Sequence, residues 1–344
     1  MPRSLRGLIA AILLPVAMIA VVACGSSDED GSATAATAGG AKPLSVALLT
    51  SGLTNDGGFN QWAAQALQKL QSDGRITLQV RQQLSDPNAA EPVLRQFASR
   101  RFDLIIGHGI DLSASVLKVA AQFPDVHFAT TGDATLEPKL LPNVEGWTYD
   151  FGQFGYVAGF VAGTVKDVTN VGIVSGPDIP FVQAGLKGFV AGLASTNPSA
   201  TTASTFTGEF YSAQKEQEAV RGLVAKGAQL VAANTAEGNG VAPAAQQAGV
   251  PTVGAAVAGS AAARQVNITS PNLDFTSVYA GYLDRLKAGT FGKRFETGTL
   301  ANKQIGIDPV NTAASAGVPA DLQAKVDELS AKLSSGELKL PSFS

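Results

Sequence analysis

The sequence predicts an α/β protein built of two Rossmann-like lobes with a ligand cleft between them. From residue 44 onward, short β-branched or aliphatic runs alternate with longer segments of helical periodicity, a pattern typical of parallel sheets covered by helices. This series occurs twice, and 344 residues with 45% hydrophobic side chains are too many for one ordinary domain. The loops that follow the strands would then face a ligand between the lobes.

The expected strands are short and fall into two groups of four. They are Leu44–Leu49, Ile76–Val80, Leu104–Ile106 and Val126–Ala129, and then Val171–Val174, Thr202–Phe206, Leu230–Ala232 and Thr252–Val253. Helices are expected between them at Gly58–Leu70, Ala90–Ala98, Ala114–Phe123, Gly155–Val165, Val182–Leu193, Ala213–Lys226 and Val241–Ala248.

The last part of the chain predicts a segment shared between the lobes. It holds a helical pattern at Phe275–Lys287, two short strands around Thr297–Ile307 and a terminal helix at Asp321–Leu333. The expected divisions are 1–23 for a signal peptide, 24–42 for a flexible tether, 43–165 and 166–270 for the two lobes, and 271–344 for the shared segment.

The N-terminus has the pattern of a secretory signal. Arg3 and Arg6 precede an apolar run, Leu8–Ala23, which is interrupted by Pro15 and too short for a comfortable membrane-spanning helix. The run ends in Val21-Val22-Ala23-Cys24-Gly25, which resembles the lipobox at which bacterial lipoproteins are cleaved and their Cys is acylated. A structural Cys after an uncleaved anchor is the alternative. We expect Cys24 to be the lipidated N-terminus of the mature protein.

Residues 25–42 predict a flexible tether, since they contain Gly, Ser, Ala, Thr and acids but no large apolar side chain that could be buried. The globular part should therefore be lipid-anchored outside the cytoplasmic membrane, because the several acyl chains of a mature lipoprotein hold it firmly there.

Composition excludes several classes of function. Cys24 is the only Cys, which rules out disulfides within the chain, a Cys-ligated zinc and an iron–sulfur cluster. His108 and His127 are the only two His, too few for a His-rich metal site, and we expect no cofactor. The net charge is −3 with no Lys/Arg cluster in the body, which argues against nucleic acid as a partner.

Several stretches together resemble one family, the basic membrane proteins of bacterial lipoproteins. They are Val46-Ala47-Leu48-Leu49-Thr50, Asn55-Asp56-Gly57-Gly58-Phe59-Asn60-Gln61, Asp103-Leu104-Ile105-Ile106-Gly107-His108-Gly109, Gln122-Phe123-Pro124-Asp125, Gly176-Pro177-Asp178-Ile179-Pro180 and Gly238-Asn239-Gly240-Val241. Characterised members of that family are purine-nucleoside receptors of ABC importers. The resemblance implies a type I periplasmic-binding-protein fold and a substrate-binding role beside an ABC permease and ATPase.

In the first lobe, the resemblance places Phe59 where the family stacks a Phe on the purine base and Asn60 at a polar position near the base. Phe59 as a core residue is the alternative, and Asp56 is more simply a cap for the helix that follows. His108 and Asp111 follow a strand in a turn with two glycines, where either side chain could hydrogen-bond a ligand. The family often has an Asp at the position of Ala114, which Asp111 would replace.

In the second lobe, Phe210 matches the family's second stacking aromatic, next to Tyr211. Phe59 and Phe210 would then sandwich a planar ring. Asn234 and Glu237 lie in the next loop after a strand, near the family's Gly-rich binding turn; a solvated loop is the alternative. Ala256 stands at or near the family's ribose-binding Asp, which makes a free nucleobase or another flat, less polar solute plausible.

No feature of the body indicates catalysis: it has no Cys nucleophile, Gly-x-Ser-x-Gly elbow, Walker A loop or His-Glu-x-x-His motif. We expect a solute-binding protein and not an enzyme. The alternative is a ligand-sensing lipoprotein that signals through a membrane receptor instead of a permease; it would share the fold and pocket.

Overall fold

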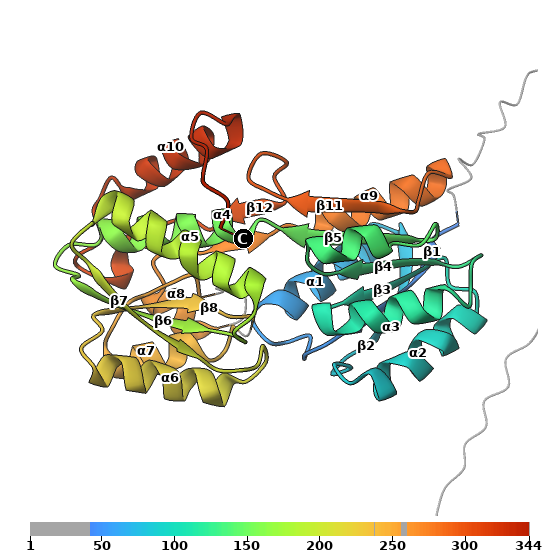
Figure 1. Ribbon diagram of the computed structural model, residues 1–344, viewed down its shortest axis with the longest axis horizontal. Coiled ribbons are helices and arrows are strands. Elements are labelled where there is room, and N and C mark those ends of the chain that lie inside the picture. The colour runs from blue at the N-terminus through green and yellow to red at the C-terminus, as the bar shows by residue number, and fades with distance from the viewer. Residues whose placement is uncertain (1–41, 237, 256–259, 344) are drawn as a thin grey trace, which may run out of the picture. The chain divides into compact units, whose positions relative to one another are not determined.

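Two parallel sheets form the framework of the protein (Figure 1). The computed structural model describes residues 42–343 except 237 and 256–259. The first sheet has the order β11-β5-β4-β3-β1-β2 and the second the order β7-β6-β8-β9, while β10 and β12 form a separate antiparallel pair. These strands are β1 (Leu44–Thr50), β2 (Ile76–Arg81), β3 (Leu104–His108), β4 (His127–Thr131), β5 (Val144–Tyr149), β6 (Asn170–Ser175), β7 (Thr201–Phe206), β8 (Leu230–Asn234), β9 (Thr252–Val253), β10 (Pro271–Leu273), β11 (Arg294–Gly298) and β12 (Ile305–Ile307).

Helices connect and cover the strands. They are α1 (Phe59–Ser72), α2 (Pro87–Ser99), α3 (Ile110–Ala120), α4 (Phe151–Thr164), α5 (Pro180–Thr196), α6 (Ala213–Ala225), α7 (Val241–Ala248), α8 (Ala261–Val266), α9 (Phe275–Ala288) and α10 (Leu322–Ser335), with short 3-10 turns at Ala134–Lys139 and Thr312–Ala314. None of the helices in the described part of the chain combines the length and the hydrophobicity that a membrane span requires.

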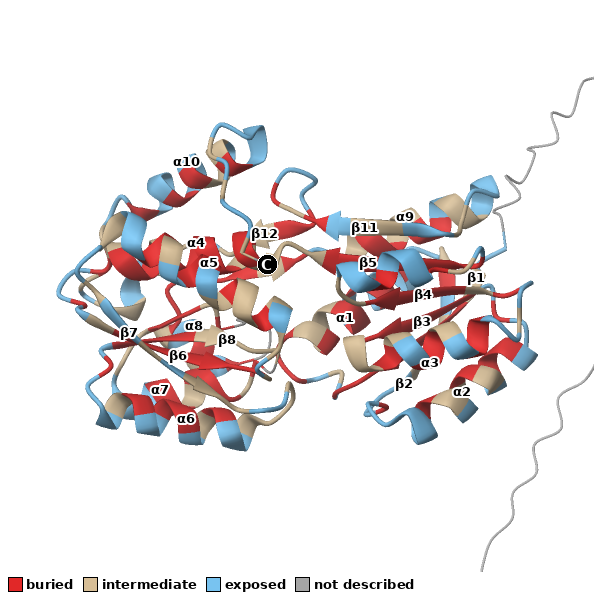
Figure 2. Ribbon diagram, viewed as in Figure 1, coloured by how far each residue is buried: buried red, intermediate tan, exposed pale blue. Residues whose placement is uncertain are grey.

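The central strands of each sheet, such as β1, β3 and β6, are buried on both faces, which explains why they are almost continuously apolar (Figure 2). In β1, Val46 and Leu48 pack on the face covered by α1 and α9, while Ala47 and Leu49 pack on the face covered by α2 and α3. The second sheet repeats this arrangement: Ile173 of β6 packs beneath α4, α5 and α10, and its neighbour Val174 beneath α6 and α7. The α/β prediction is confirmed, and all eight expected strands are present.

The chain passes between the two sheets at three places. It leaves the first sheet after β5, returns through β10 to α9 and β11, and leaves again through β12 to α10. The pairing of β10 with β12 joins the second and third passages, and the indole N–H of Trp147 in β5 donates to Gln304 Oε1 just before β12. β11 completes the edge of the first sheet beside β5, so part of the shared segment belongs to that lobe.

Helix α4 packs closely on α5 and contributes to the core of the second sheet. The boundary expected at residue 165 falls after α4. On packing grounds we propose that the second lobe begins near residue 150. Two strands, β5 and β10, and the short helix α8 were not expected from the sequence.

The contact between α4 and α5 depends on glycines in both helices. A methyl group on Gly155 or Gly159 would collide with the carbonyl oxygen of Gly185 or Phe189, and one on Gly192 would collide with that of Tyr156. The two helices therefore touch backbone to backbone. This glycine seam fixes the direction in which the N-termini of α4 and α5 point.

We expect Gly159→Ala to lower the free energy of unfolding by about 1–3 kcal/mol, because the added methyl has no room and the helices must move apart. Gly222→Ala is the matched control, since Gly222 is an exposed glycine of α6 with open space around its Cα. That change should be neutral or stabilising, as Ala forms helix better than Gly. Urea denaturation measures the free energy of unfolding of both variants. An equal effect of the two substitutions would contradict the claim that α4 and α5 touch backbone to backbone.

Candidate functional site

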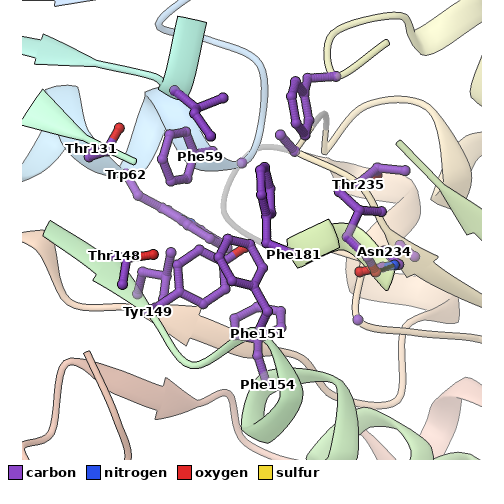
Figure 3. Close-up of a pocket in the computed structure, with 18 of the residues that line it drawn as sticks. Phe59, Trp62, Thr131, Thr148, Tyr149, Phe151, Phe154, Phe181, Asn234 and Thr235 are labelled. Carbon is purple, nitrogen blue, oxygen red and sulfur yellow. Dashed lines mark hydrogen bonds between the residues drawn. The ribbon is translucent and has the colours of Figure 1, made fainter. Parts of the chain in front are cut away.

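A pocket lies between the two sheets, where the loops after their strands meet (Figure 3). Its empty space, including the part open to solvent, is about 1050 Å³. Thr131 and Thr148 reach it from the carboxyl ends of β4 and β5, and Asn234 and Thr235 from the end of β8. This is where parallel α/β lobes are expected to hold a ligand.

Aromatic side chains dominate the wall of the pocket. Nine of them line it: Phe59, Trp62, Trp147, Tyr149, Phe151, Phe154, Phe181, Phe210 and Tyr211. None of the described lining residues is Asp, Glu, Lys, Arg or His. Such a wall offers a large flat contact area, which suits stacking on a planar solute.

Phe59 begins α1 and lies directly on His108, with ring centroids 4.1 Å apart and planes 22° from parallel. Phe275 of α9 packs edge-on against both rings. The face of Phe59 away from the solute space is therefore supported by two further aromatic rings. A supported ring loses little freedom on binding, which favours affinity.

His108 supports Phe59 and does not line the pocket. It is fully buried, its Nε2 lies 3.1 Å from the carbonyl oxygen of Phe59, and its Nδ1 lies 3.0 Å from the hydroxyl of Tyr279. Since a carbonyl can only accept, Nε2 carries the proton and Nδ1 accepts from Tyr279. His108, expected from the sequence to contact a ligand, thus lies behind Phe59, and both of its ring nitrogens have protein partners.

Asn60 and Asp56 hold the loop that carries Phe59. The carboxylate of Asp56 accepts from the backbone N–H groups of Gly58, Asn60 and Gln61 and from Asn60 Nδ2. Burial raises the pKa of Asp56, and these hydrogen bonds act against that shift. Asp56 therefore acts as the expected cap of α1. Asn60 is fully buried and does not line the pocket.

Asp111 lies in the first turn of α3, next to Ile110, which lines the pocket. The carboxyl of Asp111 is half-buried, and burial raises its pKa.

Tyr211 of the second lobe lines the pocket and packs over Gly52 of the first lobe. Burial and the nearby carboxylate of Asp111 raise the pKa of Tyr211, so its phenol stays protonated at neutral pH.

Phe210 lines the same pocket as Phe59, although the two residues come from different lobes. Its ring is parallel to that of Phe181, with centroids 5.9 Å apart and planes 7° from parallel. Phe181 contacts Phe151, which in turn contacts Tyr149 at a centroid distance of 3.9 Å. A continuous row of rings thus joins the second lobe to the end of β5.

Asn234 lines the pocket from β8, and its Nδ2 donates to the carbonyl oxygen of Val182 at 3.1 Å and to Ser175 Oγ at 3.3 Å. Its amide is therefore held in one orientation. Glu237 and Ala256, which the sequence also singled out, lie outside the described residues, as does Cys24.

The loops beside the pocket join the lobes through their backbones. The N–H of Phe59 donates to the carbonyl oxygen of Ala236 at 3.3 Å, and the N–H of Gly238 donates to that of Asp56 at 2.8 Å. A methyl group on Gly58 would lie 2.5 Å from the Ala236 oxygen, so this approach requires glycine. The position of Phe59 is thereby tied to the second lobe.

Sequence reasoning missed most of the aromatic wall. Trp62 lies one turn after Phe59 on α1, and Phe151 and Phe181 lie in the first turns of α4 and α5. Trp62 offered a signal, since residues three apart on a helix share a face. The other two were detectable only as aromatics at helix N-termini, which by themselves indicate nothing about a ligand.

Comparison with known proteins decides the family. The family model of PnrA-like ABC transporter substrate-binding proteins, Bmp, matches residues 44–337. The chain belongs to this family. It is therefore a substrate-binding protein of the ABC transporter class, as the resemblance implied, and families of this class bind solutes and are not enzymes.

Individual relatives agree with this assignment. A solute-binding protein of an ABC transporter from Conexibacter woesei is 54% identical, with a TM-score of 0.76 over 87% of this chain and 99% of that one. A purine-binding protein of Brucella abortus is 25% identical over 72% of this chain and 68% of its own length. A nucleoside-binding protein of Lactococcus lactis is 24% identical over 66% of this chain and 64% of its own length. The type I periplasmic-binding-protein fold is confirmed.

Burial lowers the pKa of His108 to about 3. An unfolded His titrates near 6.5, so between about pH 6.5 and pH 3 the unfolded chain binds a proton that the folded chain does not. We expect His108 to cost the native protein about 1.4 kcal/mol of stability per pH unit as the pH falls through this window.

The control variant for this prediction is His108→Phe, which keeps a ring beneath Phe59 but cannot be protonated. Urea unfolding from pH 7.5 to pH 4.5 should show the native protein losing stability more steeply than the variant. Parallel pH profiles would mean that His108 is not held neutral.

Proposed function

We propose that this protein is the lipid-anchored substrate-binding component of an ABC importer and binds a small planar solute, such as a purine nucleobase or nucleoside, between its lobes. The observation that carries the proposal is that Phe59 and Phe210, from different lobes, line one aromatic pocket. The names of the relatives from Brucella abortus and Lactococcus lactis support a purine or nucleoside ligand.

The pocket suggests how such a solute would be held. The supported ring of Phe59 and the ring of Phe210 would stack on the solute, while Thr131, Thr148 and Asn234 would supply hydrogen bonds at its edges. Closure of the lobes would exclude water, which strengthens those few hydrogen bonds. A solute that touches both lobes stabilises the closed arrangement through contacts absent from an open one.

A second part of the proposal concerns location. The basic residues, apolar run, small residues and Cys24 stand in the order of a lipoprotein signal, and residues 25–42 would form the tether. The protein would then sit on the outer face of the cytoplasmic membrane, where it would deliver solute to a permease driven by an ATPase.

We expect Phe59→Ala and Phe210→Ala each to weaken binding of a purine by about 1–3 kcal/mol, because each removes one stacking face. Calorimetry with adenine, guanine, adenosine and guanosine measures this. Leu53→Ala, an exposed apolar change outside the pocket lining, is the control and should bind normally. Indifference to both Phe changes would show that the ligand is held in another way.

The same titrations test selectivity. With Ala256 in place of the family's Asp, the protein should bind nucleobases more tightly than nucleosides, and Ala256→Asp should shift the preference toward nucleosides. Tight nucleoside binding by the unmodified protein would contradict this reading of position 256.

For the anchor, we expect Cys24→Ala to abolish acylation, so that the protein is either released from membranes or left unprocessed. Cell fractionation and mass spectrometry of the N-terminus report both outcomes. Ser26→Ala, a change within the tether, is the control. Normal processing and membrane retention of Cys24→Ala would refute the lipid anchor.

A further inference from the structure

A second cavity lies beside the aromatic pocket and, unlike that pocket, has charged side chains among its described lining residues. It is bounded by α1, α8, β10, the start of α9 and the residues after β12. Its wall carries hydrogen-bonding and charged side chains, among them Lys69, Arg264, Asn272, Asp308 and Asn311. We call it the polar groove. It adjoins the β10–β12 pair, where the chain passes between the lobes.

Two side chains, Trp62 and Leu273, line both the aromatic pocket and the polar groove. On α1, Phe59 lines the pocket alone, Trp62 lines both spaces, and Gln65 and Lys69 line the groove alone. This three- and four-residue spacing places all four residues along one side of the helix. Trp62 therefore stands, with Leu273, at the boundary between the two spaces.

The polar groove carries both signs of charge. Lys69 and Arg264 supply two positive charges to its lining, and Asp274 and Asp308 supply two negative ones. Asn272 Nδ2 donates to Asp308 Oδ1 at 2.5 Å. Lys69 is also paired with Asp73. A space with balanced charges, amides and carboxyl oxygens fits hydroxyl or amide groups better than an ion of either sign.

We propose that Trp62 is a specificity-determining residue that closes one end of the aromatic pocket, so that the native protein selects compact planar solutes. Shortening Trp62 would join the pocket to the polar groove and admit a neutral hydrophilic extension of the solute. This inference rests on the proposed function, since it takes the aromatic pocket as the solute site.

The test compares adenine with adenines that carry a neutral hydroxyethyl chain at N6 or at N9, using calorimetry on the full chain. The native protein should prefer adenine by about tenfold or more, the scale on which a closed pocket rejects added methylenes. Trp62→Ala should reverse this preference for at least one of the two attachment points. Trp62→Phe, which keeps a ring at the boundary, should stay close to the native protein.

An equal loss of affinity for all three compounds in Trp62→Ala would overturn the proposal, because Trp62 would then be a stacking surface only. In the Trp62→Ala background, Arg264→Ala should reduce the gain for the hydroxyethyl compounds and leave adenine unaffected. A gain that is insensitive to Arg264 would mean that the chain does not enter the groove.

A crystal structure of Trp62→Ala gives a readout that does not depend on purine binding. One continuous cavity would support the proposal that Trp62 separates the aromatic pocket from the polar groove. A wall closed again by Leu273 and its neighbours would refute it. If no adenine compound binds any form of the protein, the purine ligand is wrong, and the crystal structure still decides whether Trp62 separates the two spaces.

Discussion

The backbone contact between α4 and α5 is the constraint on which the site depends. Glycines on both helices let the axes approach until main chain meets main chain, and no larger residue fits there. α4 follows β5 of the first sheet directly and packs into the core of the second, so this seam also fixes the passage between the lobes. Its consequence at the pocket is that Phe151 and Phe181 are brought into contact, with ring centroids 4.6 Å apart.

From that seam the aromatic wall extends in both directions. Phe181 leads to Phe210 in the second lobe, and Phe151 leads to Tyr149 at the end of β5. On the other side, Phe59 is fixed by different means, namely a buried neutral His behind its ring and backbone hydrogen bonds to the opposite lobe. The shape of the pocket is thus set by rings that the fold supports. Rings held in place before binding lose less conformational entropy when a solute binds.

Much of the fold could be read from the sequence because the strands buried on both faces are almost continuously apolar. The strand β5 could not be predicted, because Glu145 and Gly146 interrupt its run of apolar residues. Glu145 is nevertheless only 1% exposed, since Arg285 and the N–H of Gly292, both far along the chain, donate hydrogen bonds to its carboxylate. β10 has three residues and exists through its pairing with β12. Such long-range partners leave no local pattern.

The sequence also predicted only part of the site. Phe59, Phe210, Tyr211 and Asn234 follow strands or begin helices at the carboxyl edge, where topology alone points to a ligand, and the structure places all four on one pocket. His108 is the last residue of β3, yet its side chain turns inward to Tyr279 on α9, a partner 171 residues away. The side-chain direction of a residue at a strand end depends on what packs behind it, which sequence spacing does not reveal.

We propose that the solute is held in the aromatic pocket between the lobes. Native mass spectrometry of the purified full chain can weigh whatever small molecule is retained. We expect a bound neutral aromatic compound that is lost from the Phe59→Ala, Phe210→Ala double variant while the variant stays folded. Retention of the same compound by the double variant, or capture of a charged aliphatic solute, would contradict it.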